Sequence, residues 1–525
     1  MRTHCVIGSG PAGVACATAL LARGANVLML DAGMELEPEL AEIARALSQK
    51  KPSEWPAKQA ARIFVKRGAD LKELPHKNLF GSDFPYRDTR EKIPWRGEGA
   101  VLPSLALGGL SNVWGASILP LRKSDISDWP IRRTDLDEHY RAAARIVGPA
   151  EQRDGLEELF TLYSENPTGL KPSRQAAQIL ENLERHREVL RARGWHFGQS
   201  RVAIRAADSS RGTGCVYCGH CMTGCVYGCI YNSADTVREL RGNKNFRYEG
   251  NVIVTKLREN GGAVSIEAFH RQTGQALSFE AGRVYLAAGV IPSAQIILRS
   301  QEAFDQPLTL RDNQYFLFPI ILARRARGVE TEALFTLSQV FLELDNPGIS
   351  RRSVHLQIYT YSDAIAGAVR RSLGPLKVFA RQVLERLVIV QGFLHSDDSS
   401  AIEMTLKRDG QKDFLQLEPR LNPETPRTIK RAVTEVLKQF RALRGIAVPP
   451  MLQIARPGRS FHCGGSIPMR AQPERFESDC AGRPSGWSRV HVVDASVLPT
   501  VPATSITFSV MANAHRIGWE TADAE

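Results

Sequence analysis

Five of the nine cysteines of the chain lie in one short segment. In a reducing compartment, such crowding favours metal binding or redox chemistry over disulfides. The first four follow a C-x2-C-x2-C-x3-C pattern, the spacing of iron–sulfur ligands in bacterial ferredoxins, although Val226 stands where proline usually follows. We therefore predict an iron–sulfur cluster, with a zinc site or a metal-free structural loop as alternatives. The expected ligands are Cys215, Cys218, Cys221 and Cys225, with Cys229 as a substitute for the last.

A glycine-rich turn follows the first apolar segment. Cys5–Ile7 is expected to form a strand, Val14–Arg23 a helix and Asn26–Leu30 a second strand. The turn before the helix reads G-x-G-x-x-G, and an acid follows the second strand. This pattern is typical of a dinucleotide-binding unit, because the glycines allow a tight turn close to the pyrophosphate and the acid accepts hydrogen bonds from a ribose. The cofactor-binding residues predicted here are Gly8, Gly10, Pro11, Ala12, Gly13 and Asp31.

The chain has 525 residues, with 68 Lys+Arg against 56 Asp+Glu and a formal net charge of +12. Hydrophobic residues make up 43% and charged residues 24%, which excludes a disordered chain, a collagen and a coiled coil. The length predicts two domains. The positive charge forms no block, so nucleic-acid binding is not expected, and an anionic cofactor, an anionic substrate or a membrane surface explains it as well. Because we find no membrane-spanning apolar run and no signal peptide, we expect a cytoplasmic protein.

Further motifs follow in order along the chain. A GGLSNVWG loop spans 108–115, a WPI segment 129–131, and an apolar strand with a glycine turn and Pro-Ser 284–293. An HCGGS turn begins at His462, and VVDASVLP at 492–499 precedes a helix over about Ile506–Thr521. With the N-terminal turn, this ordered set resembles the glucose–methanol–choline (GMC) oxidoreductase family over nearly the whole chain. Residues 300–455 match only by position.

The resemblance implies a two-domain, FAD-dependent flavoprotein of the α/β class. A Rossmann-type FAD-binding domain with a parallel sheet is assembled discontinuously, and an α+β substrate domain contains an antiparallel sheet. We assign residues 1–135, 200–312 and 450–525 to the first, and 136–199 and 313–449 to the second. Strand-like runs without alternating helices agree with an antiparallel sheet. They lie at Tyr315–Ala323, Leu334–Leu344, Val354–Tyr361, Leu387–Leu394, Ala401–Leu406 and Phe414–Leu417, with helices at Ile429–Leu443 and about Ala364–Arg386.

The resemblance also implies a reaction and its residues. Family members oxidise a CH–OH group by hydride transfer to flavin N5 with a histidine base, and His462 stands in that frame. The usual second His or Asn falls on Ser505, which can hydrogen-bond to a substrate hydroxyl but cannot act as an imidazole base. A turn histidine and a capping aspartate without a ligand are the structural alternatives for His462 and Asp494. The further cofactor-binding residues implied are Gly108, Gly109, Asn112, Asp494 and Thr507.

Three functions remain open. The first is an FAD-dependent dehydrogenase that passes electrons through the cluster to a protein partner. The second is an oxygen-dependent oxidase with a metal-free cysteine loop. The third is a non-redox flavin-binding lyase or isomerase, or a metal-bound interaction subunit, which the missing second histidine motivates. Sugars, other polyols, lipid alcohols and aromatic alcohols all remain candidate substrates.

A basic amphipathic stretch, Val369–Leu387, lies in the expected substrate domain. It either contacts an anionic membrane or packs as a lid with a solvated basic face. Gly374 and Pro375 are expected to break or kink its helix.

Overall fold

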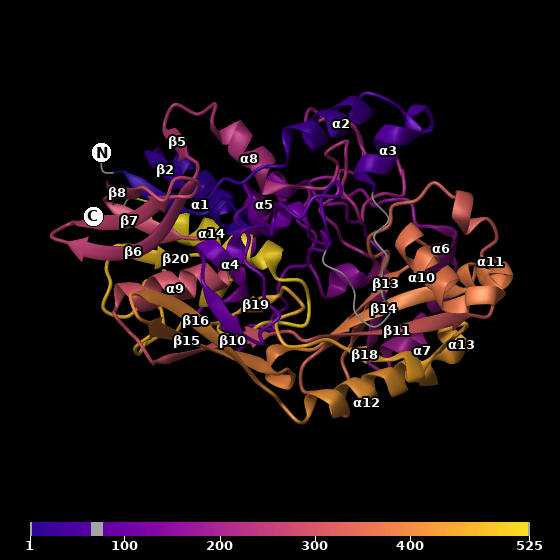
Figure 1. The fold of residues 1–525 in the computed structure, drawn as a ribbon. Helices are drawn as coiled ribbons and strands as arrows, with labels where there is room; N and C mark the ends of the chain where they lie inside the picture. Colours follow the sequence, from indigo (N-terminus) through magenta and orange to yellow (C-terminus); the bar gives the residue numbers. More distant parts are fainter. Residues whose placement is uncertain (1–2, 65–76, 523–525) are drawn as a thin grey trace.

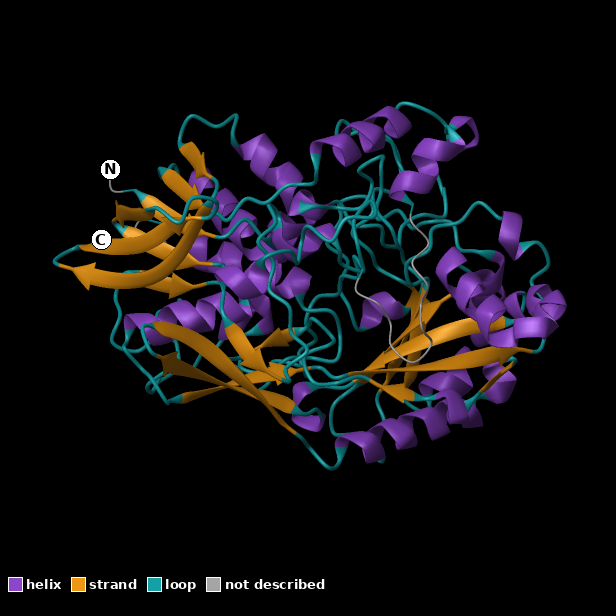
Figure 2. Cartoon of the chain, viewed as in Figure 1, coloured by secondary structure: helices purple, strands orange, loops and turns teal. Residues whose placement is uncertain are grey.

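A parallel sheet of five strands forms the first layer of the molecule. The computed structural model describes residues 3–64 and 77–522, and Figures 1 and 2 show its helices and strands. The strand order is β20-β9-β1-β2-β5, and all neighbours are parallel. Every residue of the central strand, β1, is buried, as expected for a strand covered on both faces. The strands are β1 (His4–Ile7), β2 (Val27–Leu30), β5 (Phe246–Glu249), β9 (Arg283–Leu286) and β20 (Val490–Val492).

Helices α1 (Pro11–Ala22) and α14 (Thr507–Thr521) pack together beside this sheet. Gly518 permits the close contact, because a Cβ atom there would lie 2.9 Å from the Cys16 carbonyl oxygen. Helix α5 (Asp137–Val147) packs on α14, where the Tyr140 hydroxyl lies 2.7 Å from Ser509 Oγ. The predicted strand–turn–helix–strand unit and the C-terminal helix are therefore confirmed.

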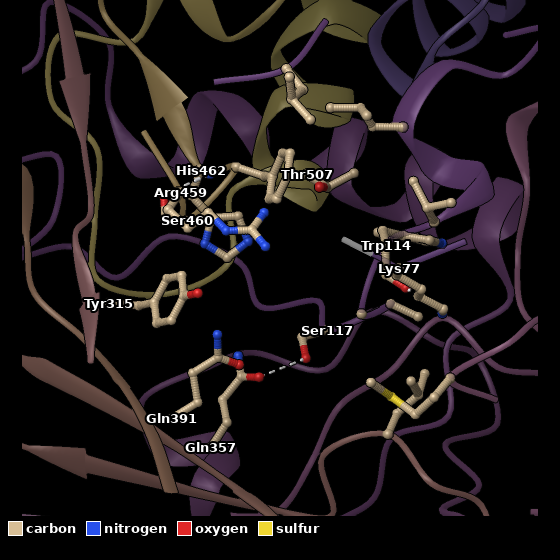
Figure 3. Close-up of a pocket in the computed structure, with 18 of the residues that line it drawn as sticks. Lys77, Trp114, Ser117, Tyr315, Gln357, Gln391, Arg459, Ser460, His462 and Thr507 are labelled. Atoms are coloured by element: carbon tan, nitrogen blue, oxygen red, sulfur yellow. Dashed lines mark hydrogen bonds between the residues drawn. The ribbon is translucent and has the colours of Figure 1, made fainter. Parts of the chain in front are cut away.

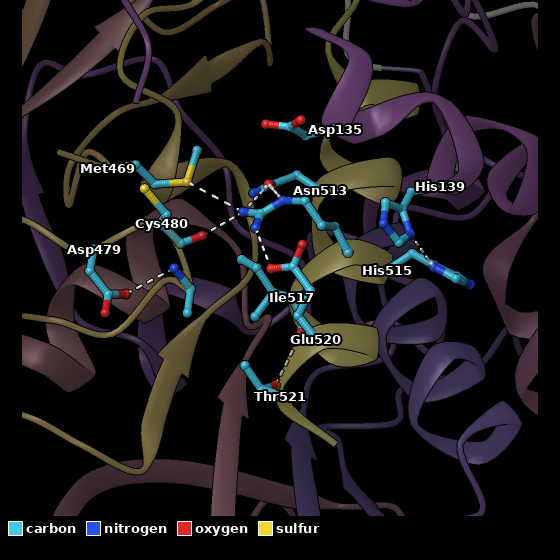
Figure 4. Close-up of polar contacts among 12 residues, drawn as sticks. Asp135, His139, Met469, Asp479, Cys480, Asn513, His515, Ile517, Glu520 and Thr521 are labelled. Carbon is cyan, nitrogen blue, oxygen red and sulfur yellow. Dashed lines mark hydrogen bonds and ion pairs between the residues drawn. The ribbon is translucent and has the colours of Figure 1, made fainter. Parts of the chain in front are cut away.

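A buried guanidinium fixes the second half of α14. Arg516 is 3% exposed and donates to the Cys480 carbonyl, to Asn513 Oδ1 at 2.9 Å and to Glu520 at 2.7 Å (Figure 4). Since a buried charge is tolerated only when its donors are satisfied, this network keeps α14 in one position. The first residues of α14 thereby stay next to the cavity described below.

A second sheet of five strands has the order β19-β10-β15-β16-β3. The sequence grouped its long hairpin, β15–β16, with the substrate sheet, but the hairpin pairs with β10 and β3 instead. The reason is its apolar face: Ile402 and Met404 pack in one core with Leu298 of α9 (Val290–Ser300). The strands are β3 (Trp95–Gly97), β10 (Pro307–Asp312), β15 (Ala401–Asp409), β16 (Lys412–Arg420) and β19 (Cys463–Gly464).

The third sheet is antiparallel, as predicted, with the order β17-β11-β14-β13-β12-β4 and β18 beside β11. Only the second half of the expected Leu334–Leu344 strand forms. One face of the sheet packs on helices α6 (Arg174–Glu184), α12 (Thr425–Lys438) and α13 (Phe440–Leu443), and the opposite face borders the cavity. The strands are β4 (Trp195–Gln199), β11 (Tyr315–Leu322), β12 (Val340–Leu344), β13 (Val354–Tyr359), β14 (Leu387–Phe393), β17 (Gly445–Ala447) and β18 (Gln453–Ile454).

The basic stretch forms a cap at the far end of this sheet (Figure 1). Helix α10 (Asp363–Leu373) ends where expected, at Gly374, and a 3₁₀ turn, Gly374–Phe379, leads into α11 (Ala380–Leu384). The other expected helix divides into α12 (Thr425–Lys438) and α13 (Phe440–Leu443). Across residues 3–64 and 77–522, no helix is long and apolar enough to cross a membrane.

The remaining elements surround these layers. A small antiparallel sheet, β6-β7-β8, has no counterpart among the predicted strands. Its strands are β6 (Val252–Asn260), β7 (Ala263–His270) and β8 (Ala276–Ala281). The other helices are α2 (Pro38–Ser48), α3 (Ala57–Ile63), α4 (Thr89–Lys92), α6 (Arg174–Glu184), α7 (Arg187–Arg191), α8 (Ser233–Leu240) and α9 (Val290–Ser300).

Candidate active site and cysteine loop

One cavity of about 750 Å³ joins the parallel sheet to the antiparallel sheet. Its first part is lined by the β1–α1 turn and the first residues of α9 and α14. Its second part is lined by β11, β13, β14 and the cap. Figure 3 shows the middle of the cavity, where His462, Arg459 and Tyr315 face Ser117 and Trp114. A volume of this size is typical of cofactor and ligand sites.

The glycines of the first turn leave room for a ligand. A Cβ atom on Gly13 would lie 2.0 Å from the Gly8 carbonyl oxygen, so the helix can sit this close only with glycine there. At Gly10, by contrast, a Cβ atom would meet no atom within 4 Å. Gly109, from the second glycine-rich loop, approaches Gly10 closely, since its own Cβ atom would lie 3.4 Å from Gly10 Cα. The open space beside Gly10 fits the pyrophosphate of a dinucleotide.

The predicted cofactor residues divide into two groups. Those that line the cavity are Gly8, Gly10, Pro11, Ala12, Asp31, Gly109, Asp494 and Thr507. Those outside its lining are Gly13, Gly108 and Asn112. The second group shapes the loops: Asn112 Nδ2 donates to the Leu107 and Gly109 carbonyls at 2.9 and 2.7 Å. The cofactor-binding roles of all these residues stay predictions. The two hydrogen bonds of Asn112 stabilise its own loop.

The two predicted acids, Asp31 and Asp494, accept hydrogen bonds from other groups of the protein. Asp31 accepts hydrogen bonds from the Ser9 and Gly33 amides at 3.0 and 2.9 Å, and burial raises its pKa to about 6. Asp494 accepts from the Gly289 amide at 2.9 Å and from Ser293 Oγ at 2.5 Å. Its other oxygen accepts from the Ser496 amide at 2.9 Å, which is the capping arrangement. Burial raises the pKa of Asp494 as well. Both acids therefore fix the cavity wall.

A buried acid places His462. The carboxylate of Asp312, at the end of β10, accepts from the Gly458 amide at 2.7 Å and from the Ser460 hydroxyl. Ser460 Oγ in turn accepts from the His462 amide at 3.0 Å. Burial raises the pKa of Asp312 to about 6. The turn is thus tied to β10, and the His462 ring lies against Phe393 with ring centroids 5.3 Å apart.

The ring of His462 is neutral and has one hydrogen-bonded nitrogen. Burial, with a smaller contribution from His355, lowers the pKa of His462 to about 4. Asn313 Nδ2 lies 3.1 Å from His462 Nδ1 and 3.0 Å from the Pro502 carbonyl oxygen. Because a carbonyl only accepts, the amide nitrogen of Asn313 must face this side and donate to Nδ1. The neutral ring then carries its own proton on Nε2.

Ser505 lies outside the cavity lining. Its side chain is buried, with 2% exposed, and its hydroxyl has no hydrogen-bond partner within the described part of the chain. The predicted contact between Ser505 and a substrate hydroxyl therefore has no geometric support, although Thr507, two residues on, does line the cavity.

Several polar side chains at the cavity were missed by sequence reasoning. Tyr315, Gln357 and Gln391 come from the region matched only by position, so no motif marked them. Lys77 donates to the Trp114 carbonyl at 2.9 Å, and burial lowers its pKa to about 8. Arg459 precedes the predicted His462 turn by three residues, and its proximity to that motif was the one available signal.

The cysteine loop lies beside this cavity. All five cysteines, including Cys229, border a second cavity of about 10 Å³, room for roughly one water molecule. Cys229 donates to the Gly214 carbonyl at 3.4 Å, and Cys221 Sγ accepts from the Thr336 amide at 3.4 Å. In residues 3–64 and 77–522, no three His, Cys, Asp or Glu side chains are arranged to hold a metal ion. The five cysteines border one small cavity, and the iron–sulfur cluster stays a prediction that this geometry does not support.

An aromatic cluster covers the outside of the cysteine loop. The ring of His220 stacks on Phe64 with centroids 4.1 Å apart, and Trp55 stacks on Tyr227 at 6.1 Å. Val226 packs in the same cluster as Phe64. The loop therefore joins α2 and α3 to the rest of the molecule, and His220 serves this packing.

Comparisons with known proteins agree with this geometry. Residues 427–514 match the family model described as GMC oxidoreductase. A crystal structure of pyridoxine 4-oxidase from Mesorbium loti shares the fold, with a TM-score of 0.60 and 16% sequence identity over 99% of each chain. A search of curated proteins found no match.

The parallel sheet and its first glycine-rich turn define a Rossmann-type dinucleotide-binding domain that borders the cavity. The resemblance drawn from the sequence is confirmed for residues 427–514, which match the GMC oxidoreductase model, and the fold of the whole chain agrees with it.

The two glycines of the first turn give a sharp test of the flavin site. Gly10 has φ −64° and ψ 177°, which alanine adopts freely. We expect Gly10→Ala to change the stability of the apoprotein by less than about 1 kcal/mol and to lower the flavin bound per chain. Gly13→Ala is the matched control, and its overpacking is expected to destabilise the apoprotein by about 3 kcal/mol. Thermal melting and flavin absorbance measure both, and a Gly10→Ala protein that retains full flavin contradicts the assignment.

Proposed function

We propose that the chain oxidises an alcohol whose hydroxyl lies at His462, where the two parts of the cavity meet. The observation that carries this proposal is the neutral, oriented imidazole between the glycine-rich turn and the antiparallel sheet. Bound FAD supplies a hydride acceptor. The flavin-binding domain comprises residues 1–135, 200–312 and 450–525, with β15 and β16 added to it, and the remaining pieces form the substrate domain.

The proton steps belong to His462 and Asn313. In the resting enzyme, Nε2–H of His462 donates to the substrate oxygen. To accept the hydroxyl proton at Nε2, the ring must carry its own proton on Nδ1 instead. Turning over the Asn313 amide presents its Oδ1, which has no hydrogen-bond partner within the described residues, to that proton, and it takes Nδ2 away from the Pro502 carbonyl. The cost is the lost hydrogen bond to the buried Pro502 carbonyl, about 1–3 kcal/mol. The hydroxyl proton then ends on His462 as the hydride leaves carbon.

His462→Ala tests this role. Loss of the proton acceptor should slow flavin reduction by substrate about a hundredfold or more while bound flavin stays unchanged. Stopped-flow bleaching and flavin absorbance measure the two quantities. In the wild type, kcat/KM should be flat from about pH 6 to 8 and fall as pH drops through about 4, because the protonated ring cannot accept. Normal bleaching in the variant, or an acid limb near the ordinary histidine pKa, contradicts the proposal.

We propose that electrons leave the flavin for oxygen, with Cys215–Cys229 as a metal-free structural loop. Three features support this: the cavity of about 10 Å³ between the thiols, the aromatic cover of the loop, and the printed name of the structural neighbour, an oxidase. The dehydrogenase with a cluster and a protein electron acceptor is the second candidate, favoured by the ferredoxin-like spacing alone.

Anaerobic purification separates these two candidates. We expect flavin without iron or acid-labile sulfide, and hydrogen peroxide equal to the substrate consumed in air. Iron and sulfide in proportion to flavin, with slow peroxide formation, would establish the cluster and redirect the search to one-electron acceptors. A Cys218→Ser variant should then lose iron, whereas the oxidase proposal predicts unchanged turnover.

We also propose that the cap contacts an anionic membrane peripherally. Its 3₁₀ turn exposes Leu376, Val378 and Phe379, which are 58%, 72% and 54% exposed. Lys377 lies in the same turn, and Arg371 and the Glu330-paired Arg370 precede it. Apolar side chains next to basic ones are the combination that anionic lipid surfaces attract.

Vesicle sedimentation tests this contact. The flavoprotein should sediment with anionic vesicles, less at high salt, and not with zwitterionic vesicles. Val378→Asp should weaken sedimentation severalfold, whereas Val189→Asp, at a valine that is 55% exposed on α7, serves as the matched control and should not. Equal sedimentation of both variants would refute the proposal.

A further inference from the structure

Strands β11, β14 and β13 present their side chains to the cavity in register. Successive residues on one face of a strand lie about 7 Å apart, so the side chains of the three strands form steps, here called rungs, leading away from His462. Rung one contains Tyr315 and Phe393, with His355 paired to Phe393 but outside the cavity lining; rung two contains Leu317, Gln391 and Gln357; rung three Pro319, Ile389 and Tyr359; rung four Ile321 and Leu387. The distance from rung two to rung four is about 14 Å along the strands.

The chemistry of the wall changes along these rungs. The polar groups of Tyr315, Gln391 and Gln357 lie on rungs one and two, beside His462. On rungs three and four, the one polar group is the Tyr359 hydroxyl, which donates back to Gln357 at 3.2 Å. The cavity is therefore polar where the reaction occurs and apolar beyond it.

The cap completes the apolar part. Ile365, Ala368 and Leu373 of α10 and Val383 of α11 face Ile321 and Leu387 across the cavity. Ser362 is polar, but its oxygen accepts from the Ile365 amide and caps α10. No charged side chain among the described residues of α10 and α11 lines the cavity. Ala364 and Ser372 line it and are exposed, so this part, here called the apolar arm, reaches the surface.

We propose that the substrate is an amphipathic alcohol whose hydroxyl lies at rungs one and two and whose hydrocarbon tail fills the apolar arm. The proposal rests on the proposed oxidation at His462 and names its substrate class. A sugar or another polyol would lose hydrogen bonds to water for each hydroxyl placed in the arm, without a partner to replace them. A hydrocarbon tail gains free energy with each methylene removed from water.

A series of unbranched primary alcohols tests the proposal on the flavoprotein. From ethanol to octanol, kcat/KM for flavin reduction should rise about fourfold per methylene until the arm is filled. Glucose, sorbitol and glycerol should remain below the longer alcohols. A flat series, or a sugar that exceeds octanol, overturns the substrate class while leaving the proposed oxidation intact.

Two tryptophan variants on α10 test whether the dependence of kcat/KM on chain length arises in the apolar arm. Ala368 is 2% exposed and lines the arm, so Ala368→Trp should reduce the ratio of octanol to ethanol kcat/KM at least tenfold. Arg370 is exposed on the outside of α10 and pairs with Glu330, so Arg370→Trp should leave that ratio unchanged. Equal ratios in both variants would overturn the placement of the tail.

Binding separates this inference from the proposed function. If no alcohol reduces the flavin, the proposed oxidation fails, but calorimetric binding of octanol still reports on the arm. Binding that Ala368→Trp weakens at least tenfold and Arg370→Trp does not would support the arm. Absence of octanol binding to the wild-type flavoprotein would overturn it.

Discussion

The buried carboxylate of Asp494 is the contact on which the cofactor end of the cavity depends. It joins the segment after β20 to the start of α9, through the Gly289 amide and Ser293, and caps its own turn through the Ser496 amide. Because these partners come from segments about 200 residues apart, one side chain fixes the relative position of two walls. Leaving any of these donors without an acceptor would cost a buried hydrogen bond, about 1–3 kcal/mol. The turn that carries His462 is fixed in the same manner by Asp312.

The two faces of the antiparallel sheet have separate roles, one in the stability of the sheet and one in the choice of substrate. Alternation along β11 sends Phe316, Phe318 and Ile320 into the core under α12, while Tyr315, Leu317 and Ile321 border the cavity. The core face carries the stability of the sheet. The cavity face is therefore free to change its chemistry from polar to apolar over a few residues without weakening the layer behind it.

Local patterns predicted the parts of the molecule that depend on neighbours in sequence. The β1–α1–β2 unit, α14, the break at Gly374 and the cavity position of His462 all follow from short motifs. Asn313 and Asp312 could not be found this way, because they act on His462 from about 150 residues away. Ser505 is predicted as a site residue only from its position before the C-terminal helix. The direction of its side chain is set by tertiary packing, which that position does not reveal. Leu334, predicted as strand, instead pairs in an isolated bridge with Cys218 of the cysteine loop.

The rungs also imply a way for substrate range to diverge. Each rung along the strands adds a fixed length to the cavity. A single bulky residue on rung three or four would therefore limit the length of the hydrocarbon tail that the cavity accepts. Such a change lies two rungs or more from His462 and its supports Asn313 and Asp312. Substitutions at Ile389 or Leu387 would therefore change which alcohols are accepted, while the residues around His462 stay the same.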